Sequence, residues 1–475
     1  MAKVKTTFTC QSCGAEFPKW QGKCFECGAW NSLVESVAAT RKSQGLTKAE
    51  PQALSRISTM SYRRLATGYS EFNRVLGGAE NEAGIVPGSV ILLAGEPGIG
   101  KSTLLLQIAA STAQADEQKN KETEEQESSL VSQFLSSSVL YVSGEESVEQ
   151  LKLRADRLGL DSEKVFTLPE TDVDVIGETI SRLVGLTEKE TAQPPNRPTV
   201  NLLIIDSIQT LKTSDLTSAA GSISQVQECA RRLSQLAKNM NLPLILVGHI
   251  TKGGIIAGPK ALEHLVDVVL YLEGERFNDF RILRGIKNRF GQTSEIGIFR
   301  MMDKGMAEVK NPSTEMLSTR KQGVPGSVLT VTIEGQRPLL LEIQTLTSRT
   351  AFGLPRRTVN GIDYNRLLML LAVLQKRVGL SFVNQDVYVN VAGGFKSSEP
   401  ALDLAICLSL ASSLKNKVLP KDVLAIGEVG LLGEIKQPPR FEERIREAKK
   451  LGFTKIITHT AFDSIKEAIK EATGY

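Results

Sequence analysis

Long apolar runs are missing from this 475-residue sequence, and so is any strong excess of charge of one sign. No stretch reaches the roughly 18 consecutive apolar residues of a membrane-spanning helix, and the start, MAKVKTTFTC, lacks the apolar core of a signal peptide. We therefore expect a cytoplasmic protein with no membrane partner. The formal net charge of +4 is small for this length, so any surface that binds nucleic acid must be a local basic patch.

Cysteine is also scarce, but four of the six cysteines stand close together near the start. Cysteines of a cytoplasmic protein stay reduced, so a spaced cluster indicates a metal site rather than disulfides. Two Cys-x2-Cys pairs form this cluster: Cys10, Cys13, Cys24 and Cys27. Four thiolates suit one structural Zn²⁺, which would supply the folding energy of residues 1–33. In the same segment, Trp20, Lys23 and Trp30 suit either stacking on nucleobases or packing within a very small domain.

The remaining residues predict two larger domains, because 475 residues exceed what one hydrophobic core usually supports. Residues 34–60 lack sustained periodicity and are interpreted as a linker. From 61 to 310, the apolar runs SVILLAG, SVLYVSG, VNLLIIDS and LPLILVGHI alternate with helical patterns, which predicts a parallel sheet buried on both faces. A short linker, 311–325, precedes a second α/β domain at 326–475. Two stretches poor in apolar residues are expected to be solvated insertions, at 114–138 and 187–198.

The segment GEPGIGKST fits the phosphate-binding pattern G-x4-G-K-[ST], and it stands between the strand pattern SVILLAG and the helix pattern TLLLQIAAS. Glycines let backbone N–H groups surround the phosphates of ATP, while Lys101 reaches the β and γ oxygens and Ser102 ligates Mg²⁺. The predicted nucleotide contacts of this loop are Gly95, Glu96, Pro97, Gly98, Ile99, Gly100, Lys101, Ser102 and Thr103.

Acidic residues follow two other predicted strands. Asp206 ends the run NLLIID, where it could cap a helix, but beside a phosphate loop a role in holding Mg²⁺ is favoured. LYVSGEES places Glu145 and Glu146 at the end of another strand, where a carboxylate can take a proton from an attacking water. We predict Glu145 as this general base and Glu146 as the reserve. The alternative for either residue is an acidic turn that caps the following helix.

The order of these motifs resembles the RecA-like ATPases, and specifically the bacterial RadA or Sms family of DNA repair proteins. The resemblance covers nearly the whole chain, and the motifs that carry it include WQGKCFECGAWN, GYSEFNRVLGG, GEPGIGKSTLLLQIA, YVSGEES, IIDSIQT, VGHITK and KNRFG. It implies a homo-oligomer, expected to be a hexameric ring, with ATP bound between neighbouring subunits. It also implies single-stranded and branched DNA and a RecA-type recombinase as partners.

The resemblance assigns a catalytic role to Lys287 and Arg289 of KNRFG, because a Lys-x-Lys or Lys-x-Arg pair of related proteins reaches the neighbouring subunit's γ-phosphate. Spaced two apart on the strand pattern FRILRGIKNRF, the two cations would project from one face. Contacts with DNA phosphates or a solvated basic edge are the alternatives. The resemblance further places DNA-facing loops at 211–222 and 250–260, with three candidate DNA-binding residues, Lys212, Lys252 and Lys260.

The C-terminal domain resembles a Lon protease domain in VNVAGGFKSSEPALDLAICLSLASS and GEVGLLGEIKQPPRFEERIREAKKLGF. The serine and lysine of such a domain would fall at Ala401 and near Glu442, so the Ser/Lys dyad is missing and the domain is expected to be catalytically inactive. Four basic residues are candidate phosphate ligands or members of a solvated helix face, namely Lys396, Arg440, Arg444 and Arg446.

These patterns predict an α/β protein with three parts: a zinc knuckle, a RecA-like P-loop ATPase core and a Lon-protease-like α/β domain. The function implied by the resemblance is a DNA-dependent ATPase that translocates on DNA and promotes branch migration in recombinational repair. Two alternatives stay open. One is a nucleotide-dependent regulatory ring of the KaiC kind, in which DNA plays no part, and the other is a Lon-like peptidase, which the missing dyad disfavours.

Overall fold

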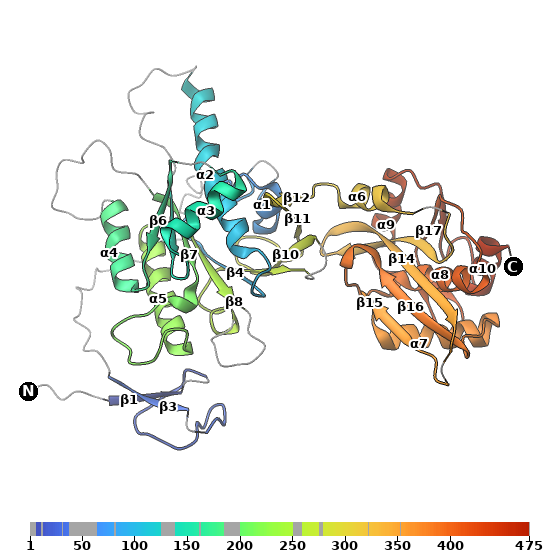
Figure 1. The fold of residues 1–475 in the computed structure, drawn as a ribbon, viewed down its shortest axis with the longest axis horizontal. Helices are drawn as coiled ribbons and strands as arrows, with labels where there is room; N and C mark the ends of the chain where they lie inside the picture. Colours follow the sequence, from blue (N-terminus) through green and yellow to red (C-terminus); the bar gives the residue numbers. More distant parts are fainter. Residues whose placement is uncertain are drawn as a thin grey trace, which may run out of the picture. The chain divides into compact units, whose positions relative to one another are not determined.

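The chain divides into two compact units (Figure 1), one of Met1–Glu273 with Arg281–Glu308 and one of Gly274–Phe280 with Val309–Tyr475. Within the described residues of this computed structural model, no helix is both long enough and apolar enough to cross a membrane. The described residues are 6–10, 13–30, 32–37, 64–79, 82–124, 138–160, 163–184, 200–249, 259–274, 279–321, 323–351 and 353–474.

The N-terminal ribbon is a three-stranded antiparallel sheet with β1 (Thr6–Cys10) between β2 (Glu16–Phe17) and β3 (Leu33–Val37). Residues 34–37 therefore belong to β3, whereas the sequence predicted the start of a linker there. Pairing with β1 holds these residues in a strand, and that pairing is a contact that local periodicity does not reveal. The rest of the predicted linker lies outside the described residues.

The first unit is built on nine strands, namely β4 (Val90–Gly95), β5 (Ser138–Ser143), β6 (Val165–Pro169), β7 (Val200–Asp206), β8 (Leu244–His249), β9 (Val268–Glu273), β10 (Phe280–Asn288), β11 (Ile296–Met302) and β12 (Gly305–Glu308). Their order in the sheet is β12-β11-β10-β9-β4-β8-β7-β5-β6. The strands from β9 to β6 pair in parallel, and β10 runs antiparallel to β9. The four apolar runs named from the sequence form β4, β5, β7 and β8, so the predicted parallel sheet is confirmed.

Helices cover both faces of this sheet, which explains why its central strands are apolar throughout. Ile91 and Leu93 of β4 pack on one face with α1, α2 and α3, while Val90 and Leu92 pack on the other with α4 and α5. The helices of this unit are α1 (Ser70–Leu76), α2 (Lys101–Glu124), α3 (Val148–Leu158), α4 (Val173–Val184) and α5 (Ile223–Asn239), with 3-10 turns η3 (Ile208–Thr210) and η4 (Pro259–Ala261).

The predicted insertion at 114–138 begins as a continuation of α2, which ends at Glu124. Residues 125–137 lie outside the described part of the chain, and so does the second predicted insertion, 187–198.

The second unit holds a six-stranded sheet in the order β15-β16-β14-β13-β17-β20 and a separate two-stranded pair, β18-β19. Its strands are β13 (Ser327–Glu334), β14 (Arg337–Arg349), β15 (Arg357–Asn360), β16 (Gln385–Val391), β17 (Val423–Ala425), β18 (Glu428–Val429), β19 (Ile435–Lys436) and β20 (Lys455–Ile457). Its helices and helical turns are α6 (Pro312–Thr319), α7 (Tyr364–Val373), η5 (Leu374–Val378), η6 (Ala392–Gly394), η7 (Pro400–Leu402), α8 (Asp403–Lys415), α9 (Phe441–Lys450) and α10 (Ile465–Thr473).

Helix α6 falls in residues 311–325, where the sequence predicted a linker. Pro312 stands in its first turn, a position that suits proline because the missing N–H is not needed there. The hydroxyl of buried Ser313 accepts a hydrogen bond from the Leu340 N–H of β14 at 3.1 Å. The helix is therefore packed on the sheet by a contact that the sequence does not show.

The prediction that Arg444 is a phosphate ligand or part of a solvated helix face is wrong, because the side chain is buried. Its residue is only 2% exposed, and its guanidinium donates two 2.9 Å hydrogen bonds to the carboxylate of Glu399. It also donates to the carbonyl oxygens of Val331 at 2.7 Å and Pro439 at 3.1 Å. A buried guanidinium needs such partners, so α9 turns Arg444 inward to join it to β13 and the segment before α8.

Replacing Arg444 by methionine should destabilise the second unit by about 3–5 kcal/mol, because Glu399 is left with a charge that has lost its buried partner. Hydrogen exchange of the full chain would measure this as faster exchange across β13, whose Val331 carbonyl Arg444 binds. The matched control is Arg446→Met on the same helix, where the exposed side chain predicts a change within about 0.5 kcal/mol. Equal effects of the two substitutions would contradict the assigned role of Arg444.

Candidate nucleotide and metal sites

The phosphate loop runs from the end of β4 into the start of α2. Gly98 and Gly100 have φ angles of 77° and 109°, a conformation that favours glycine. A Cβ on Gly100 would also stand 2.1 Å from the methyl carbon of Met306. The positive φ angles make both positions strained for any other residue, and at Gly100 a Cβ would also displace the Met306 side chain.

Lys101 begins α2 at the end of this loop and is only 3% exposed. Its Nζ donates to the carbonyl oxygens of Gly95 at 2.9 Å and Glu96 at 3.0 Å. Burial lowers the pKa of the Lys101 ammonium to about 8, although the nearby carboxylates of Asp206 and Glu145 act in the opposite direction. The ammonium is thus held inside the loop, close to two acids and without a full water shell.

Asp206 ends β7 and is buried beside the loop. The hydroxyl of Tyr141, on the neighbouring strand β5, donates to Asp206 Oδ2 at 2.5 Å. Burial raises the pKa of Tyr141 well above its ordinary value, so the phenol stays protonated and keeps donating. A buried carboxylate, together with the Ser102 hydroxyl at the start of α2, is an oxygen-donor set of the kind that Mg²⁺ prefers. The sequence analysis did not single out Tyr141, whose strand position only marks it as a buried side chain.

The two adjacent glutamates have different surroundings. Glu145 Oε1 accepts a hydrogen bond from the Ser207 hydroxyl at 2.6 Å and lies 3.4 Å from His249 Nε2. The hydrogen bond from His249 is the largest influence that lowers the pKa of Glu145, to about 2, so this carboxyl is ionised at neutral pH. Glu146 instead pairs with Arg154 of α3 at 2.5 Å. Of the two acids, Glu145 is the one that joins the groups around Lys101 and Asp206.

His249 was not assigned a role from the sequence, although it stands in the motif VGHITK. It ends β8, which lies next to β4 and β7 in the sheet. Its Nδ1 atom is buried without a hydrogen-bond partner among the described residues. Because β4, β5, β7 and β8 run in parallel, Lys101, Asp206, Glu145 and His249 all lie where the carboxyl ends of these strands meet.

Lys287 and Arg289 lie at the opposite end of the parallel strands, near their amino ends. Strand β10 is antiparallel to β9, and Lys287 pairs with Val269 near the amino end of β9. The six residues of β4 separate the two ends by about 17 Å. The cations of one chain are therefore far from that chain's own phosphate loop.

Both cations bind the segment that precedes β9. Lys287 Nζ donates to the carbonyl oxygens of Glu263 at 2.6 Å and Val266 at 2.7 Å. Arg289 pairs with the buried Asp267 at 2.9 Å, while 53% of its side chain stays exposed. Strand β10 ends at Asn288 and contains an irregularity between Gly285 and Lys287, so Arg289 follows the strand rather than lying on it as expected. The two side chains nevertheless meet the same segment.

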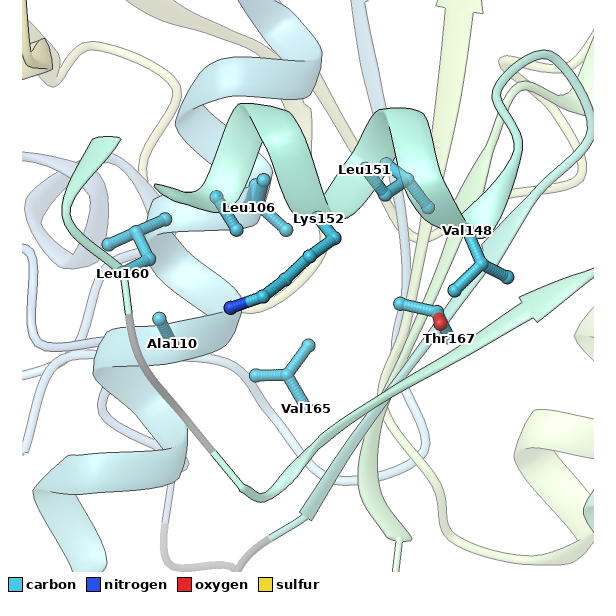
Figure 2. A pocket seen from close by; sticks show the side chains of 9 residues that line it. Leu106, Ala110, Val148, Leu151, Lys152, Leu160, Val165 and Thr167 are labelled. Carbon is cyan, nitrogen blue, oxygen red and sulfur yellow. The ribbon is translucent and has the colours of Figure 1, made fainter. Parts of the chain in front are cut away.

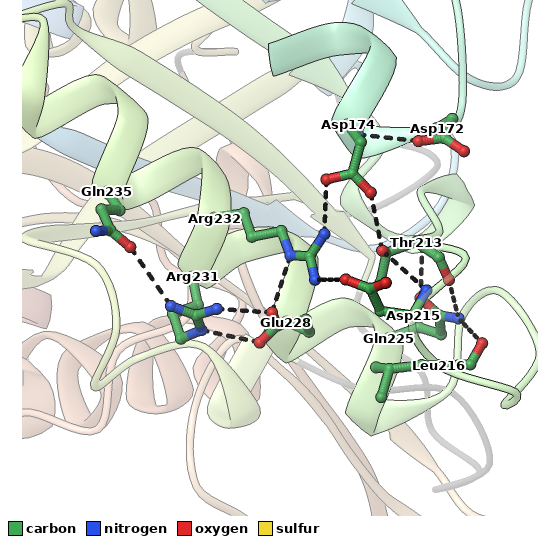
Figure 3. Close-up of polar contacts among 10 residues, drawn as sticks. All are labelled: Asp172, Asp174, Thr213, Asp215, Leu216, Gln225, Glu228, Arg231, Arg232 and Gln235. Atoms are coloured by element: carbon green, nitrogen blue, oxygen red, sulfur yellow. Dashed lines mark hydrogen bonds and ion pairs between the residues drawn. The ribbon is translucent and has the colours of Figure 1, made fainter. Parts of the chain in front are cut away.

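The predicted DNA-facing loop 211–222 has a fixed internal structure (Figure 3). The buried amide of Gln225, on α5, donates to the carbonyl oxygens of Thr213 and Leu216, both at 3.1 Å, and Ser218 at 2.9 Å. Its oxygen accepts from the Thr213 N–H at 2.9 Å. One side chain thus satisfies four backbone groups of the loop.

Arg232, also on α5, ties the same loop to α4 (Figure 3). It pairs with Asp174 of α4 at 2.6 Å, with Glu228 at 2.9 Å and with Asp215 of the loop. Of the predicted DNA-binding residues, Lys212 and Lys260 are exposed, and Lys252 lies outside the described residues.

The four ribbon cysteines converge on one point. Their sulfur atoms all lie within 4.8 Å of one another, with Cys10 Sγ 3.7 Å from Cys27 Sγ and Cys13 Sγ 3.6 Å from Cys24 Sγ. Zn–S bonds of about 2.3 Å place tetrahedral sulfurs about 3.8 Å apart, so the spacing fits Zn²⁺. Two turns of the same form build the site, because Gly14 N–H donates to Cys10 O at 2.8 Å and Gly28 N–H to Cys24 O at 2.9 Å.

A cavity of about 240 Å³ lies between α2, α3 and β6 (Figure 2). None of the residues assigned to phosphate binding lines it, and we give it no part in nucleotide chemistry. Its lining is mostly apolar, with the Lys152 side chain extended across it: Leu106, Ala110, Val148, Leu151, Lys152, Ala155, Leu160, Val165 and Thr167.

Three protein families match parts of the chain: the AAA domain at residues 81–254, the rubredoxin metal binding domain at 8–35 and subunit ChlI of Mg-chelatase at 344–461. DNA repair protein RadA of Bacillus subtilis (strain 168) is 48% identical over 469 residues, covering 97% of this chain and 94% of the relative. The RadA protein of Listeria monocytogenes serovar 1/2a (strain ATCC BAA-679 / EGD-e) is 46% identical over 465 residues, covering 96% of this chain and 93% of the relative. The chain belongs to the DNA repair protein RadA family.

A crystal structure of the RadB recombinase aligns with 52% of this chain and 100% of that chain at a TM-score of 0.35 and 20% identity, which is too distant to support an argument. The family matches confirm the predicted fold class of this RadA-family chain. Its N-terminal ribbon is a four-cysteine zinc-binding domain, its centre is a RecA-like ATPase domain, and its C-terminal part is a ChlI- or Lon-like α/β domain.

The C-terminal domain offers no serine at the position where a Lon-type nucleophile would fall. Ala401 is buried there, and the position of the lysine base carries the exposed acid Glu442. Lys436, the nearest lysine before it in sequence, pairs with Glu434 at 3.2 Å. These surroundings give no support to a serine peptidase.

Purified RadA-family chain should contain one zinc ion per molecule, and Cys24→Ser should lose most of it, because three thiolates hold Zn²⁺ less tightly than four. Elemental analysis after extensive dialysis measures the content. Cys229→Ser, which changes a buried cysteine of α5 outside the cluster, is the control and should keep its zinc. Equal zinc content in both variants would contradict the four-cysteine site.

Proposed function

We propose that this RadA-family chain is a DNA-dependent ATPase that hydrolyses ATP to translocate on DNA and so promotes branch migration during recombinational repair. The observation that carries the proposal is the meeting of Lys101, Asp206, Glu145 and His249 at one end of the parallel strands, directly beside the phosphate loop. The supporting observation for DNA is the ordered loop 211–222, which follows the same end and exposes Lys212. Single-stranded and branched DNA and a RecA-type recombinase are the proposed partners.

In this proposal Lys101 and the loop amides bind the phosphates of ATP, and Ser102 and Asp206 hold Mg²⁺. When bound, Mg²⁺ neutralises charge on the phosphate oxygens. Tyr141 keeps the Asp206 carboxylate in place. Glu145 accepts a proton from the attacking water, and Ser207 and His249 orient its carboxylate for that transfer.

We further propose that hydrolysis takes place between subunits of a ring, expected to be hexameric. Lys287 and Arg289 are separated from their own phosphate loop by the length of β4, so a role on ATP requires a neighbouring chain. Two cations at the γ-phosphate would stabilise the charge of the transferred phosphoryl group, an effect of about 10³–10⁵ in rate in other systems. The partly exposed Arg289 is the more accessible of the two side chains.

Replacing Glu145 by glutamine should lower ATP turnover by about 10²-fold or more while ATP still binds, because the amide cannot accept the proton. Phosphate release measures turnover, and a fluorescent ATP analogue measures binding. Glu146→Gln is the matched control and should change turnover only a few-fold, since Glu146 faces Arg154 instead of the site. A larger loss in Glu146→Gln than in Glu145→Gln would reverse the assignment.

Mixing Lys101→Ala chains with Lys287→Ala chains should restore ATP hydrolysis that neither variant shows alone. Recovery is expected because a mixed interface can combine an intact phosphate loop from one chain with an intact Lys287 from the next. Each variant at the total concentration of the mixture provides the control.

The same assay with and without single-stranded DNA tests two alternatives: that KNRFG binds DNA, and that the chain forms a regulatory ring in which DNA plays no part. If Lys287→Ala alone hydrolyses ATP but does not respond to DNA, and the mixture is no more active than its Lys287→Ala component, then KNRFG binds DNA instead of a neighbour's ATP. If DNA leaves the rate of the unmodified chain unchanged, the regulatory-ring alternative replaces the DNA motor.

A further inference from the structure

The two tryptophans of the chain both stand on the zinc ribbon, and both are exposed to solvent. Trp20 is 57% exposed and Trp30 is 73% exposed. The small core of the ribbon is made by other residues, which are Phe8, Cys10, Ala15, Phe17, Cys24 and Leu33. Packing within a very small domain, one of the two roles that the sequence allowed for these rings, is therefore not what they do.

The two indole rings border the same glycine. A Cβ on Gly22 would lie 3.9 Å from Trp20 Cη2 and 4.0 Å from Trp30 Cζ3. Lys23 is bridged to Trp30 in an antiparallel β-pair, and its Nζ lies 5.6 Å from the centre of the Trp30 ring. Trp20, Trp30 and Lys23 thus form one surface, here termed the aromatic platform, with a glycine in place of a side chain between its rings.

We propose that the aromatic platform binds unpaired nucleobases of single-stranded DNA. Exposed indole faces stack on any base, and a lysine beside a ring supplies the positive charge that the adjoining phosphate requires. Such binding does not depend on base sequence, which suits a protein that follows DNA. The proposal rests on the proposed function in that DNA is the ligand, and it deepens that function by adding a contact outside the ATPase domain.

A protein partner is the less favoured occupant. Exposed aromatic rings also occur at protein–protein interfaces, but here an ammonium lies 5.6 Å from the centre of one ring, and a single DNA strand offers both a flat base and a phosphate to such a pair. This pairing of flat rings with a cation matches the alternation of base and phosphate along a single strand.

Intrinsic tryptophan fluorescence of the full, zinc-loaded chain reports on the platform alone, because no tryptophan lies elsewhere. Adding oligothymidylate without nucleotide should quench this emission. An abasic oligomer of the same length, which has the phosphates but no bases, should quench it far less. Equal quenching by both oligomers would show that charge alone drives binding and would overturn the proposal.

Substitution of both rings provides the second measurement. Trp20→Leu with Trp30→Leu should weaken binding of labelled oligothymidylate, read by anisotropy, about tenfold or more, since each lost stack is worth about 1–3 kcal/mol. Trp20→Phe with Trp30→Phe keeps flat rings and should retain most of the affinity. All variants should keep their zinc, which verifies that the ribbon is folded.

The outcomes distinguish failure of this inference from failure of the proposed function. If DNA stimulates ATP hydrolysis but neither quenches fluorescence nor binds more weakly to the leucine variant, the motor stands and the platform proposal falls. If the leucine variant instead loses binding to a RecA-type recombinase while it binds DNA normally, the platform serves a protein partner and the proposal is wrong. If the unmodified chain neither binds DNA nor responds to it, both proposals fail together.

Discussion

Parallel pairing of β4, β8, β7 and β5 buries the central strands of the ATPase domain on both faces, and the rest of its chemistry depends on that constraint. A buried strand has no place for an ionised side chain along its length, because an unpaired charge in a low-dielectric core is very costly. Ionised groups are therefore confined to the strand ends. At the carboxyl ends they meet the amides of the phosphate loop, where an anion is favourable.

At the carboxyl ends of the strands, Asp206 and Glu145 are each held by hydrogen bonds or ion pairs with side chains from other strands. Tyr141 on β5 donates a hydrogen bond to Asp206 on β7. Glu145, which follows β5, is contacted by Ser207, which follows β7, and by His249 of β8. Each carboxylate is thus positioned by a side chain from a different strand. Such cross-strand support gives the proposed metal ligand and the proposed base separate roles and separate environments, which is what distinguishes two acids in one site.

The amino ends of the parallel strands carry the cationic motif instead. KNRFG places Lys287 and Arg289 against the segment before β9, about the length of one strand away from the phosphate loop of the same chain. Asn288 donates to the Leu76 carbonyl at the end of α1, which anchors the motif between the two cations. A chain that carries its phosphate loop and its cationic pair at opposite ends of these strands is suited to act with identical neighbours, and this separation supports the proposed ring.

Local patterns along the chain were enough to predict the parallel sheet, the phosphate loop and the cysteine cluster, because these depend on apolar runs, glycine positions and cysteine spacing. They also pointed to Asp206, the last residue of one apolar strand, and to Glu145, two residues after another. Only the tertiary structure turned Glu146 toward Arg154, buried Arg444 against Glu399 and brought Tyr141 and His249 to the acids. The contacts of Tyr141, His249 and Arg444 join residues 45 or more positions apart, so they depend on how distant segments pack. The Glu146–Arg154 pair depends on the course of the turn before α3, which the spacing of residues along the chain does not encode either.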